Sequence, residues 1–300
     1  MKKSISLLLA GMMLCGALAG CGGNNDANYG AGDGSQTGSD GETAGMTGAI
    51  HVVSREDGSG TRGAFVELTG VEDDNGDNTT VEAEIANRTD AVMTTVAGNE
   101  SAIGYISLGS LNDTVKAVTV DGVEATVDNV KSGAYTLSRP FNIATKGEPT
   151  GVAADFINFI MSADGQAIVG EDYITVNDEA AAFTSDGSSG QITVGGSSSV
   201  SPVMEQLIEA YEAVNPGAQI DLQTSDSTSG MTGAIDGTFA IGMASRELSE
   251  EEAAELTGQA IAMDGIAVIV NTANTVEDLA MDQIRGIYVG EITDWSEVAA

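Results

Sequence analysis

From Ala49 onward, short apolar runs alternate with segments whose apolar residues recur at helical spacing. The apolar runs are rich in β-branched residues and predict strands at residues 49–53, 103–108, 116–120, 192–194 and 261–270. The helical spacing predicts helices at residues 62–68, 152–161, 201–214 and 281–288. Strands that alternate with helices in this way predict an α/β fold.

The segment 201–214 shows the helical pattern most completely. Ser201 is a favourable N-cap, and Pro202 is favoured at the first helical position. Five apolar side chains then fall on one face, namely Val203, Leu207, Ile208, Tyr211 and Val214. The run Asn215-Pro216-Gly217 that follows is a helix stop.

Two polar stretches divide the chain. Residues 22–48 are mostly Gly, Ser, Asn, Asp and Thr, a composition that buries too little apolar surface to fold, so we expect a flexible spacer there. A second polar linker, residues 180–191, separates the short run Ile174–Val176 from the strand at 192–194. At about 150 residues per domain, 300 residues are expected to form two domains or one body with two lobes.

The first 21 residues indicate export. Met1-Lys2-Lys3 is basic, and the apolar stretch 5–18 is short for a transmembrane helix. The following Leu18-Ala19-Gly20-Cys21 resembles a bacterial lipobox, which implies cleavage before Cys21 and lipidation of its sulfur. The alternative is an ordinary signal peptide in which Cys21 is incidental. We therefore expect a protein tethered to the extracytoplasmic face of the cell membrane.

The charge balance excludes several classes of function. The chain has 45 acidic and 11 basic residues, a formal net charge of −34 and a pI near 4.1. Such a surface repels nucleic acid. One His and two Cys do not supply a Cys- or His-rich zinc site, and a Ser–His or Cys–His nucleophile would have to use His51. The sequence therefore predicts no metal, no cofactor and no enzymatic activity.

Three loops share one design, in which a strand is followed by Gly with Ser or Thr and then by a helix start. They are residues 54–61, 195–201 and 225–232. A helix N-terminus presents free N–H groups and a partial positive charge, so it favours anions, and hydroxyls add further donors. The three loops together predict an anion site.

The loop 54–61 carries the most chemistry, because it combines Arg55, Asp57, Ser59 and Thr61. A guanidinium is suited to bidentate contact with an oxyanion. An ionised Asp57 only accepts hydrogen bonds, so it would bind an oxyanion that carries a proton, as phosphate does and sulfate does not at neutral pH. Alternatively, Asp57 orients Arg55 or caps the turn.

Four motifs are similar to those of one known family. The run Ser54–Arg62 resembles the signature loop of the phosphate-binding lipoproteins that serve high-affinity phosphate ABC importers. Ile192–Ser199 resembles the first strand and loop of that family, and Ile241–Leu248 and Gly290–Trp295 resemble its middle motifs. The similarity covers about residues 50–298. It implies a type II periplasmic-binding-protein fold with two α/β lobes, a hinge and an interlobe cleft.

The motifs stand in an unusual order, because the family has the loop of the 195–199 type first and the loop of the 55–61 type second. The resemblance thus implies a circular permutation, with residues 180–191 joining the former ends. The alternative is a truncated tandem protein. The implied lobe II is 49–111 with 263–300, and lobe I is 112–262. The hinge crossings are then expected near 108–111 and 260–264. The order of the motifs is compatible with two halves that pair within one chain and with two halves that pair between the chains of a swapped dimer.

The resemblance also implies the phosphate contacts. They are Arg55, Asp57, Ser59, Gly60, Thr61, Ser198, Ser199 and Ser227, with Ser197, Thr228 and Ser229 as alternatives if the register slips. Some members of the family have Asp after the residue that matches Ser245, where this chain has Arg246 as a second cation.

The implied function is capture of inorganic phosphate and its delivery to ABC permease subunits by a monomer anchored through Cys21. Phosphate sensing or adhesion through the same cleft is the alternative. A phosphate-ester hydrolase is a more distant one, since Ser59 lacks the Gly two residues before it that a nucleophile elbow needs.

Overall fold

The computed structural model describes residues 45–298. The predicted signal peptide, Cys21 and most of the predicted spacer lie outside these residues. The strands are β1 (His51–Arg55), β2 (Glu72–Asp73), β3 (Gly76–Asp77), β4 (Glu84–Ala86), β5 (Ala102–Ser107), β6 (Lys116–Ala117), β7 (Thr119–Val120), β8 (Ser138–Thr145), β9 (Gly190–Ser197), β10 (Ala218–Ser225), β11 (Ile241–Ala244), β12 (Thr257–Val270) and β13 (Asp278–Leu279). The helices are α1 (Gly60–Thr69), α2 (Thr89–Gly98), α3 (Val127–Ser132), α4 (Val152–Ile160), α5 (Ala163–Asp172), α6 (Ser201–Val214), α7 (Ser227–Asp236), α8 (Glu250–Glu255), α9 (Met281–Tyr288) and the 3₁₀ turns η1 (Leu108–Ser110) and η2 (Trp295–Glu297).

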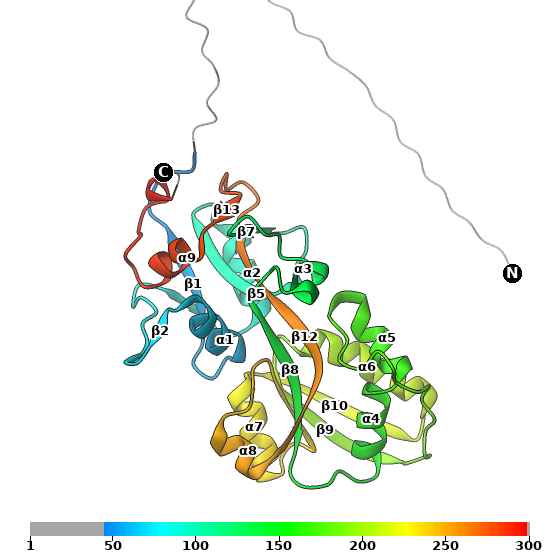
Figure 1. Ribbon diagram of the computed structural model, residues 1–300. Helices are drawn as coiled ribbons and strands as arrows, with labels where there is room; N and C mark the ends of the chain where they lie inside the picture. The colour runs from blue at the N-terminus through cyan, green and yellow to red at the C-terminus, as the bar shows by residue number, and fades with distance from the viewer. Residues whose placement is uncertain (1–44, 299–300) are drawn as a thin grey trace, which may run out of the picture. The chain divides into compact units, whose positions relative to one another are not determined.

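One mixed sheet joins the two halves of the chain. Its strand order is β10-β9-β11-β8-β12-β5-β1-β4, and β6 also pairs with β12. Strands followed by helices pair in parallel, such as β1 with β4 and β9 with β10. By contrast, β8 and β12 are antiparallel to each other and lie side by side through the centre of Figure 1. Strand β8 of the first half lies between β11 and β12 of the second half.

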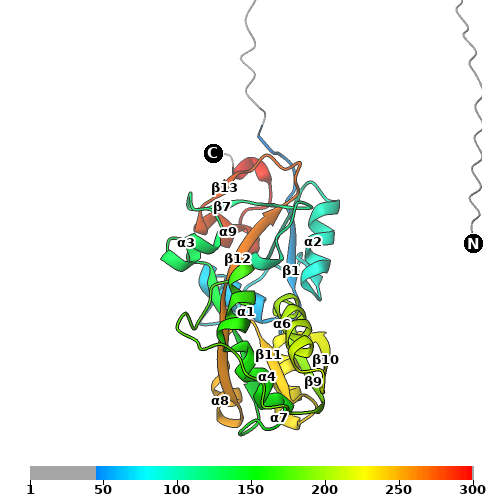
Figure 2. The same cartoon turned by 90° about the vertical axis from the view of Figure 1, so that its right-hand side faces the viewer.

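The two largest hydrophobic cores lie in separate lobes, and the ribbons of Figures 1 and 2 show this division of the body. The lobe II core packs α1 and α9 against the sheet and includes Phe65, Tyr105 and Trp295. The lobe I core packs α4 and α6 against β9 and β11 and includes Phe156 and Tyr211. Strand β12 contributes to both cores, and β8 continues from Leu137 of the lobe II core to Phe141 of the lobe I core, so these two strands connect the lobes.

The lobe boundary differs from the one that the sequence predicts. Residues 112–137, expected in lobe I, place Val118, Val130, Tyr135 and Leu137 in the lobe II core. The reason is strand pairing, since β6 pairs with β12 and β7 with β13, both on the lobe II side. The first crossing therefore lies in β8 between residues 137 and 141, not at 108–111. The second lies in β12 between residues 261 and 266, close to the predicted 260–264.

The N-cap of α6 also differs from the prediction. Val200 occupies that position and Ser201 is the first helical residue, with Pro202 beside it. The Ser201 hydroxyl instead donates to the carbonyl of Ser197 at 3.2 Å. Between residues 45 and 298, no helix is long and apolar enough to cross a membrane. The same residues contain no group of three His, Cys, Asp or Glu side chains placed to hold a metal ion.

Candidate functional site: a buried hydroxyl cluster between the lobes

Four helices begin at one place between the lobes. Helices α1 and α2 follow β1 and β4 in lobe II, and α6 and α7 follow β9 and β10 in lobe I. Each is at least ten residues long, and each carries a hydroxyl residue in its first turn or just before it. Ligands of open α/β sheets bind at the carboxyl ends of the strands, and the free N–H groups of helix N-termini favour anions. The fold thus directs four positive helix ends to one interlobe space.

Hydroxyl side chains fill this space. We call Thr61, Thr89, Ser197, Ser198, Ser199, Ser227 and Ser245 the hydroxyl cluster; all seven residues are buried. Thr61 of lobe II reaches Ser199 of lobe I at 2.8 Å between the two hydroxyl oxygens. Thr89 lies 3.4 Å from Ser198 and 3.3 Å from Ser199, again oxygen to oxygen. Within lobe I, Ser197 donates to Ser245 at 3.0 Å. Because a hydroxyl both donates and accepts, the cluster can turn its protons toward a bound oxyanion.

Arg55 brings a positive charge to the cluster. Its side chain is only 2% exposed, and Nη2 donates to the Ser198 hydroxyl at 3.1 Å. Glu56 holds the guanidinium from behind, because Nε and Nη2 donate to its two carboxylate oxygens at 2.7 Å each. The charge is therefore fixed in position, and the Nη1 group faces Thr89 at 3.5 Å.

Gly60 lets the two lobes approach each other. A Cβ atom at this position would lie 2.4 Å from the Ser227 hydroxyl and 2.8 Å from that of Ser245. Gly196 serves the same purpose within lobe I, because its φ of +136° disfavours other residues and a Cβ there would lie 2.3 Å from the Met243 carbonyl oxygen. Both glycines are thus required by close contact beside the cluster.

Most of the predicted site residues lie together here. Arg55, Gly60, Thr61, Ser198, Ser199 and Ser227 all belong to the cluster or contact it. Ser59 is buried and caps α1, since its hydroxyl oxygen accepts from the Arg62 N–H at 3.3 Å. Of the register alternatives, Ser197 lies in the cluster, whereas Thr228 bonds to the Gly58 carbonyl and Ser229 to Asp226 at exposed positions.

Asp57 is the exception, because this structure places its side chain away from the cluster. Its side chain is 97% exposed and forms an ion pair with Arg62 at 2.8 Å. It does not orient Arg55 either, because Glu56 does so. The loop buries Arg55 and turns the Asp57 side chain toward solvent, while Gly58 contacts Thr228.

The structure adds three residues that the sequence did not single out as contacts. Thr89 and Ser245 belong to the cluster, and Arg139 of β8 donates from Nη2 to the Thr61 hydroxyl at 3.0 Å. The additional cation beside the cluster is therefore Arg139, whereas Arg246 pairs with Glu252 at 2.7 Å. Ser245 stands in a recognised motif, but Thr89 and Arg139 lie in segments without one.

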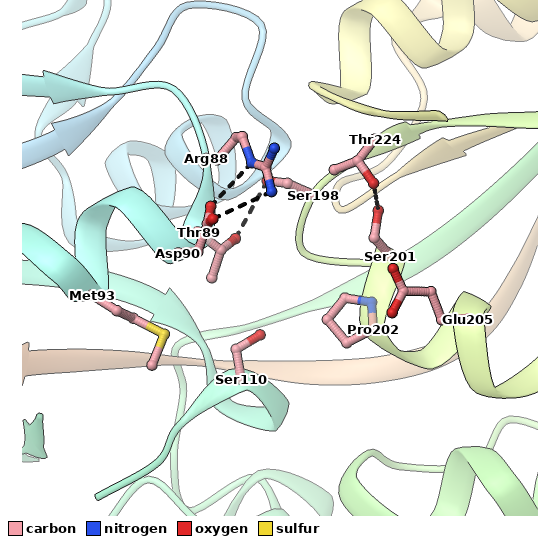
Figure 3. A pocket seen from close by; sticks show the side chains of 10 residues that line it. All are labelled: Arg88, Thr89, Asp90, Met93, Ser110, Ser198, Ser201, Pro202, Glu205 and Thr224. Atoms are coloured by element: carbon pink, nitrogen blue, oxygen red, sulfur yellow. Dashed lines mark hydrogen bonds and ion pairs between the residues drawn. The ribbon is translucent and has the colours of Figure 1, made fainter. Parts of the chain in front are cut away.

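A cavity of about 360 Å³ adjoins the cluster on one side. Figure 3 shows Thr89 and Ser198, two members of the cluster, in its wall together with Arg88, Ser110 and Pro202. Arg88 pairs with Asp90 in the same view. The cavity lies between the starts of α2 and α6, so it faces both lobes.

The arrangement can bind an oxyanion through many donors. A serine nucleophile needs an adjacent base. The single histidine of the chain, His51, bonds instead to Glu84 at 2.8 Å at the start of β1. The hydroxyls of the cluster bond mainly to one another and to guanidinium groups.

Comparison with known proteins agrees with this geometry. The family model of the PBP superfamily domain matches residues 31–164 and 181–300. The chain belongs to the PBP superfamily. Its match resumes at residue 181, within the linker between the two halves.

Individual relatives of this PBP-superfamily chain are similar over most of their length. Phosphate-binding protein PstS 2 of Streptococcus agalactiae is 46% identical over 305 residues, which cover 99% of this chain and 98% of the relative. Phosphate-binding protein PstS 2 of Streptococcus pneumoniae is 46% identical over 84% of this chain and 88% of its own length. The crystal structure of a phosphate-binding protein of a phosphate ABC transporter from S. pneumoniae superimposes with a TM-score of 0.68 over 84% of this chain and all of that one.

The S. agalactiae relative aligns along nearly its whole length, so its two halves stand in the same order as in this chain. The order is therefore shared by at least one relative. Its origin in a circular permutation stays a prediction.

Proposed function

We propose that this protein binds inorganic phosphate between its lobes and delivers it to an ABC importer. The observation that supports this most strongly is the hydroxyl cluster, in which four helix N-termini and the Arg55 guanidinium converge on buried Ser and Thr side chains from both lobes. The names of the relatives agree, since they are phosphate-binding proteins and one is part of a phosphate ABC transporter.

The donors of the hydroxyl cluster are sufficient in number for micromolar affinity for phosphate. Neutral hydrogen bonds contribute ~0.5–1.5 kcal/mol net each and charged ones ~1.5–3 kcal/mol. About ten such bonds reach the ~8 kcal/mol of micromolar binding after ordering costs. The net charge of −34 repels an anion at long range, so the affinity has to come from these local donors in a cleft that excludes water.

The proposal includes the location of the protein. Lipidation of Cys21 would hold a monomer on the extracytoplasmic face of the membrane, and the polar residues 22–48 would separate the folded body from the bilayer. Metabolic labelling with a fatty acid tests this part. We expect label in the wild-type chain and none in Cys21→Ala, and equal labelling of both would contradict it.

Phosphate uptake by cells tests the transport function. Cells that lack the gene should lose high-affinity uptake of labelled phosphate, and the wild-type gene should restore it. The Arg55→Gln gene should fail to restore uptake although its product reaches the cell surface. Normal uptake in the deletion strain, together with phosphate binding by the purified protein, would favour sensing or adhesion.

A further inference from the structure

The hinge carries a buried ion pair that the proposed function does not yet use. Arg139 of β8 and Asp264 of β12 are register partners on the two strands that connect the lobes. Arg139 is 2% exposed and Asp264 is 1% exposed. Their charged groups lie 3.2 Å apart, Nη2 to Oδ2. A buried charge is costly unless it is paired and fully hydrogen-bonded, so such a pair at a hinge calls for an explanation.

This pair is poorly satisfied. Within residues 45–298, Arg139 Nε and Nη1 and Asp264 Oδ2 have no hydrogen-bond partner. Asp264 Oδ1 accepts only a long bond from the Gly109 N–H at 3.4 Å. The buried hydroxyls of Ser107 and Tyr173 nearby make no hydrogen bond of normal geometry among the same residues, although the Ser107 hydroxyl is close enough to lower the pKa of Asp264. The pair is thus a weak source of stability, because its desolvation is compensated only in part.

Arg139 is connected to the anion site by one contact. Its Nη2 donates to the Thr61 hydroxyl oxygen at 3.0 Å, and Thr61 lies 2.8 Å from Ser199 across the cleft. A hydroxyl has one proton and two lone pairs. When the guanidinium occupies a lone pair, the Thr61 proton points away from Arg139 and is directed toward the cluster, where an anion would accept it.

The charges around the cluster support the same interpretation. Burial lowers the pKa of Arg139, the Asp264 carboxylate raises it, and the charge of Arg55 lowers it further. Two guanidinium groups therefore approach the cluster closely enough to repel each other. A bound dianion relieves that repulsion, whereas Asp264 weakens the field of Arg139 at the site.

We infer that Arg139 is a positioning residue that turns Thr61 into a hydrogen-bond donor toward the bound oxyanion. We also infer that Asp264 holds Arg139 in place while it limits the attraction of Arg139 for the anion. The inference rests on the proposed function, because the anion is taken to be phosphate. It assigns the two members of the pair opposite effects on affinity. A pair with a purely structural role would affect affinity in the same direction from either side.

Calorimetric titration of the purified protein with inorganic phosphate tests the inference, with the thermal midpoint recorded for each variant. We expect Arg139→Gln to weaken binding at least tenfold, Arg139→Lys to recover part of the loss because it keeps the charge, and Asp264→Asn to bind at least as tightly as wild type. Arg246→Gln is the matched control, since it breaks a partly buried Arg–Glu pair outside the cluster, and its affinity should stay within about twofold.

Three results would overturn the inference while the proposed function stands. One is a folded Arg139→Gln protein with wild-type affinity. Another is Asp264→Asn weakening binding as much as Arg139→Gln does. If Arg139→Gln does not fold, a folded Arg139→Lys protein decides, because wild-type affinity in that variant would contradict the need for the planar guanidinium at Thr61. Absence of phosphate binding by the wild-type protein would contradict the proposed function instead.

Discussion

Two buried polar networks in this protein differ in how completely their groups are paired. In lobe I, the Asp155 carboxylate accepts from the Tyr211 hydroxyl at 2.9 Å, the Ser185 hydroxyl at 2.8 Å and the Asp186 N–H at 3.0 Å. Between the lobes, the hydroxyls of the cluster bond to one another and to guanidinium groups, and the neighbouring Arg139 retains Nε and Nη1 without a partner among the described residues. A saturated network serves to hold segments together, whereas a network with surplus donors is suited to a ligand.

The position of each network supports this distinction. Asp155 lies on α4 and ties the linker residues 185–186 to α6, far in sequence from the signature loop. The cluster takes its members from both lobes, and the contacts of Thr61 and Thr89 with Ser199 join one lobe to the other. The predictions below test whether affinity depends on the second network and stability on the first.

Arg55 should produce the largest effect on affinity. Arg55→Gln removes the buried charge at Ser198 and leaves Glu56 without its partner. Two lost charged hydrogen bonds at ~1.5–3 kcal/mol each predict a loss of about 100-fold or more. Phosphate titration measures it, with the exposed Arg285→Gln as control. An Arg55→Gln affinity within threefold of wild type would remove Arg55 from the site.

Asp264 should make stability depend on pH. Burial raises the pKa of Asp264 to about 6 from the ordinary value of 3.8, although Arg139 acts in the opposite direction. The folded state therefore binds this proton more tightly than the unfolded state, and the contribution of Asp264 to stability is largest below about pH 4 and is lost as the pH rises through about 6.

Urea unfolding of wild type and Asp264→Asn from pH 4 to pH 7 checks this prediction. As the pH rises from 4 to 7, the wild-type protein should lose on the order of 3 kcal/mol in unfolding free energy relative to Asp264→Asn. A constant difference would show that Asp264 has an ordinary pKa.

Asp155 should affect stability without affecting affinity. Asp155→Asn replaces acceptor oxygens with an amide that faces other donors, so we expect a loss of about 2 kcal/mol in the free energy of unfolding. Phosphate affinity should remain unchanged. Asp186→Asn, at an exposed position in the same linker, should change stability by about 0.5 kcal/mol or less. A tenfold loss of affinity in Asp155→Asn would erase the distinction between the two networks.

Gly60 allows a matched pair of substitutions on one helix. In Gly60→Ala the new methyl group would contact Ser227 and Ser245 of the other lobe, so closure should be impaired and affinity reduced about tenfold. In Gly63→Ala the nearest atom is 3.9 Å away, and affinity should not change. Equal affinities would mean that Gly60 is not a close contact in the bound state.

Asp57 should have the smallest effect. Its carboxylate is exposed and paired with Arg62, so Asp57→Asn should change phosphate affinity less than twofold and leave the preference for phosphate over sulfate intact. A clear gain of sulfate binding in this variant would restore the role that the sequence suggested for Asp57.

The sequence predicted those elements whose pattern is local. The helix 281–288 was predicted with the bounds of α9, and the helix that ends at Val214 was predicted to begin one residue later than α6 does, because Ser201 was expected to be its N-cap. Strand β8 was missed since Pro140 argues against a central strand, and yet β8 pairs with both β11 and β12. Its role as a hinge strand is set by partners more than 90 residues away, which no local pattern contains.

The sequence predicted the site residues that lie in a local motif and missed those that the packing of the chain brings to the cluster. Arg55, Thr61 and the serines before α6 carry their signal in a Gly/Ser loop before a helix. Thr89 and Arg139 reach the cluster only through the packing of α2 and β8 in the folded chain. The exposed position of Asp57 was not predicted, because residue type and spacing do not reveal on which side of a turn a side chain points.

Titration of phosphate-free protein with phosphate, and then with sulfate, tests the central claim most directly. The hydroxyl cluster predicts one phosphate bound per chain with micromolar or tighter affinity, and loss of that binding in Arg55→Gln. A folded wild-type protein that binds no phosphate, or that binds it equally well without Arg55, would contradict the assignment of the interlobe cluster as a phosphate site.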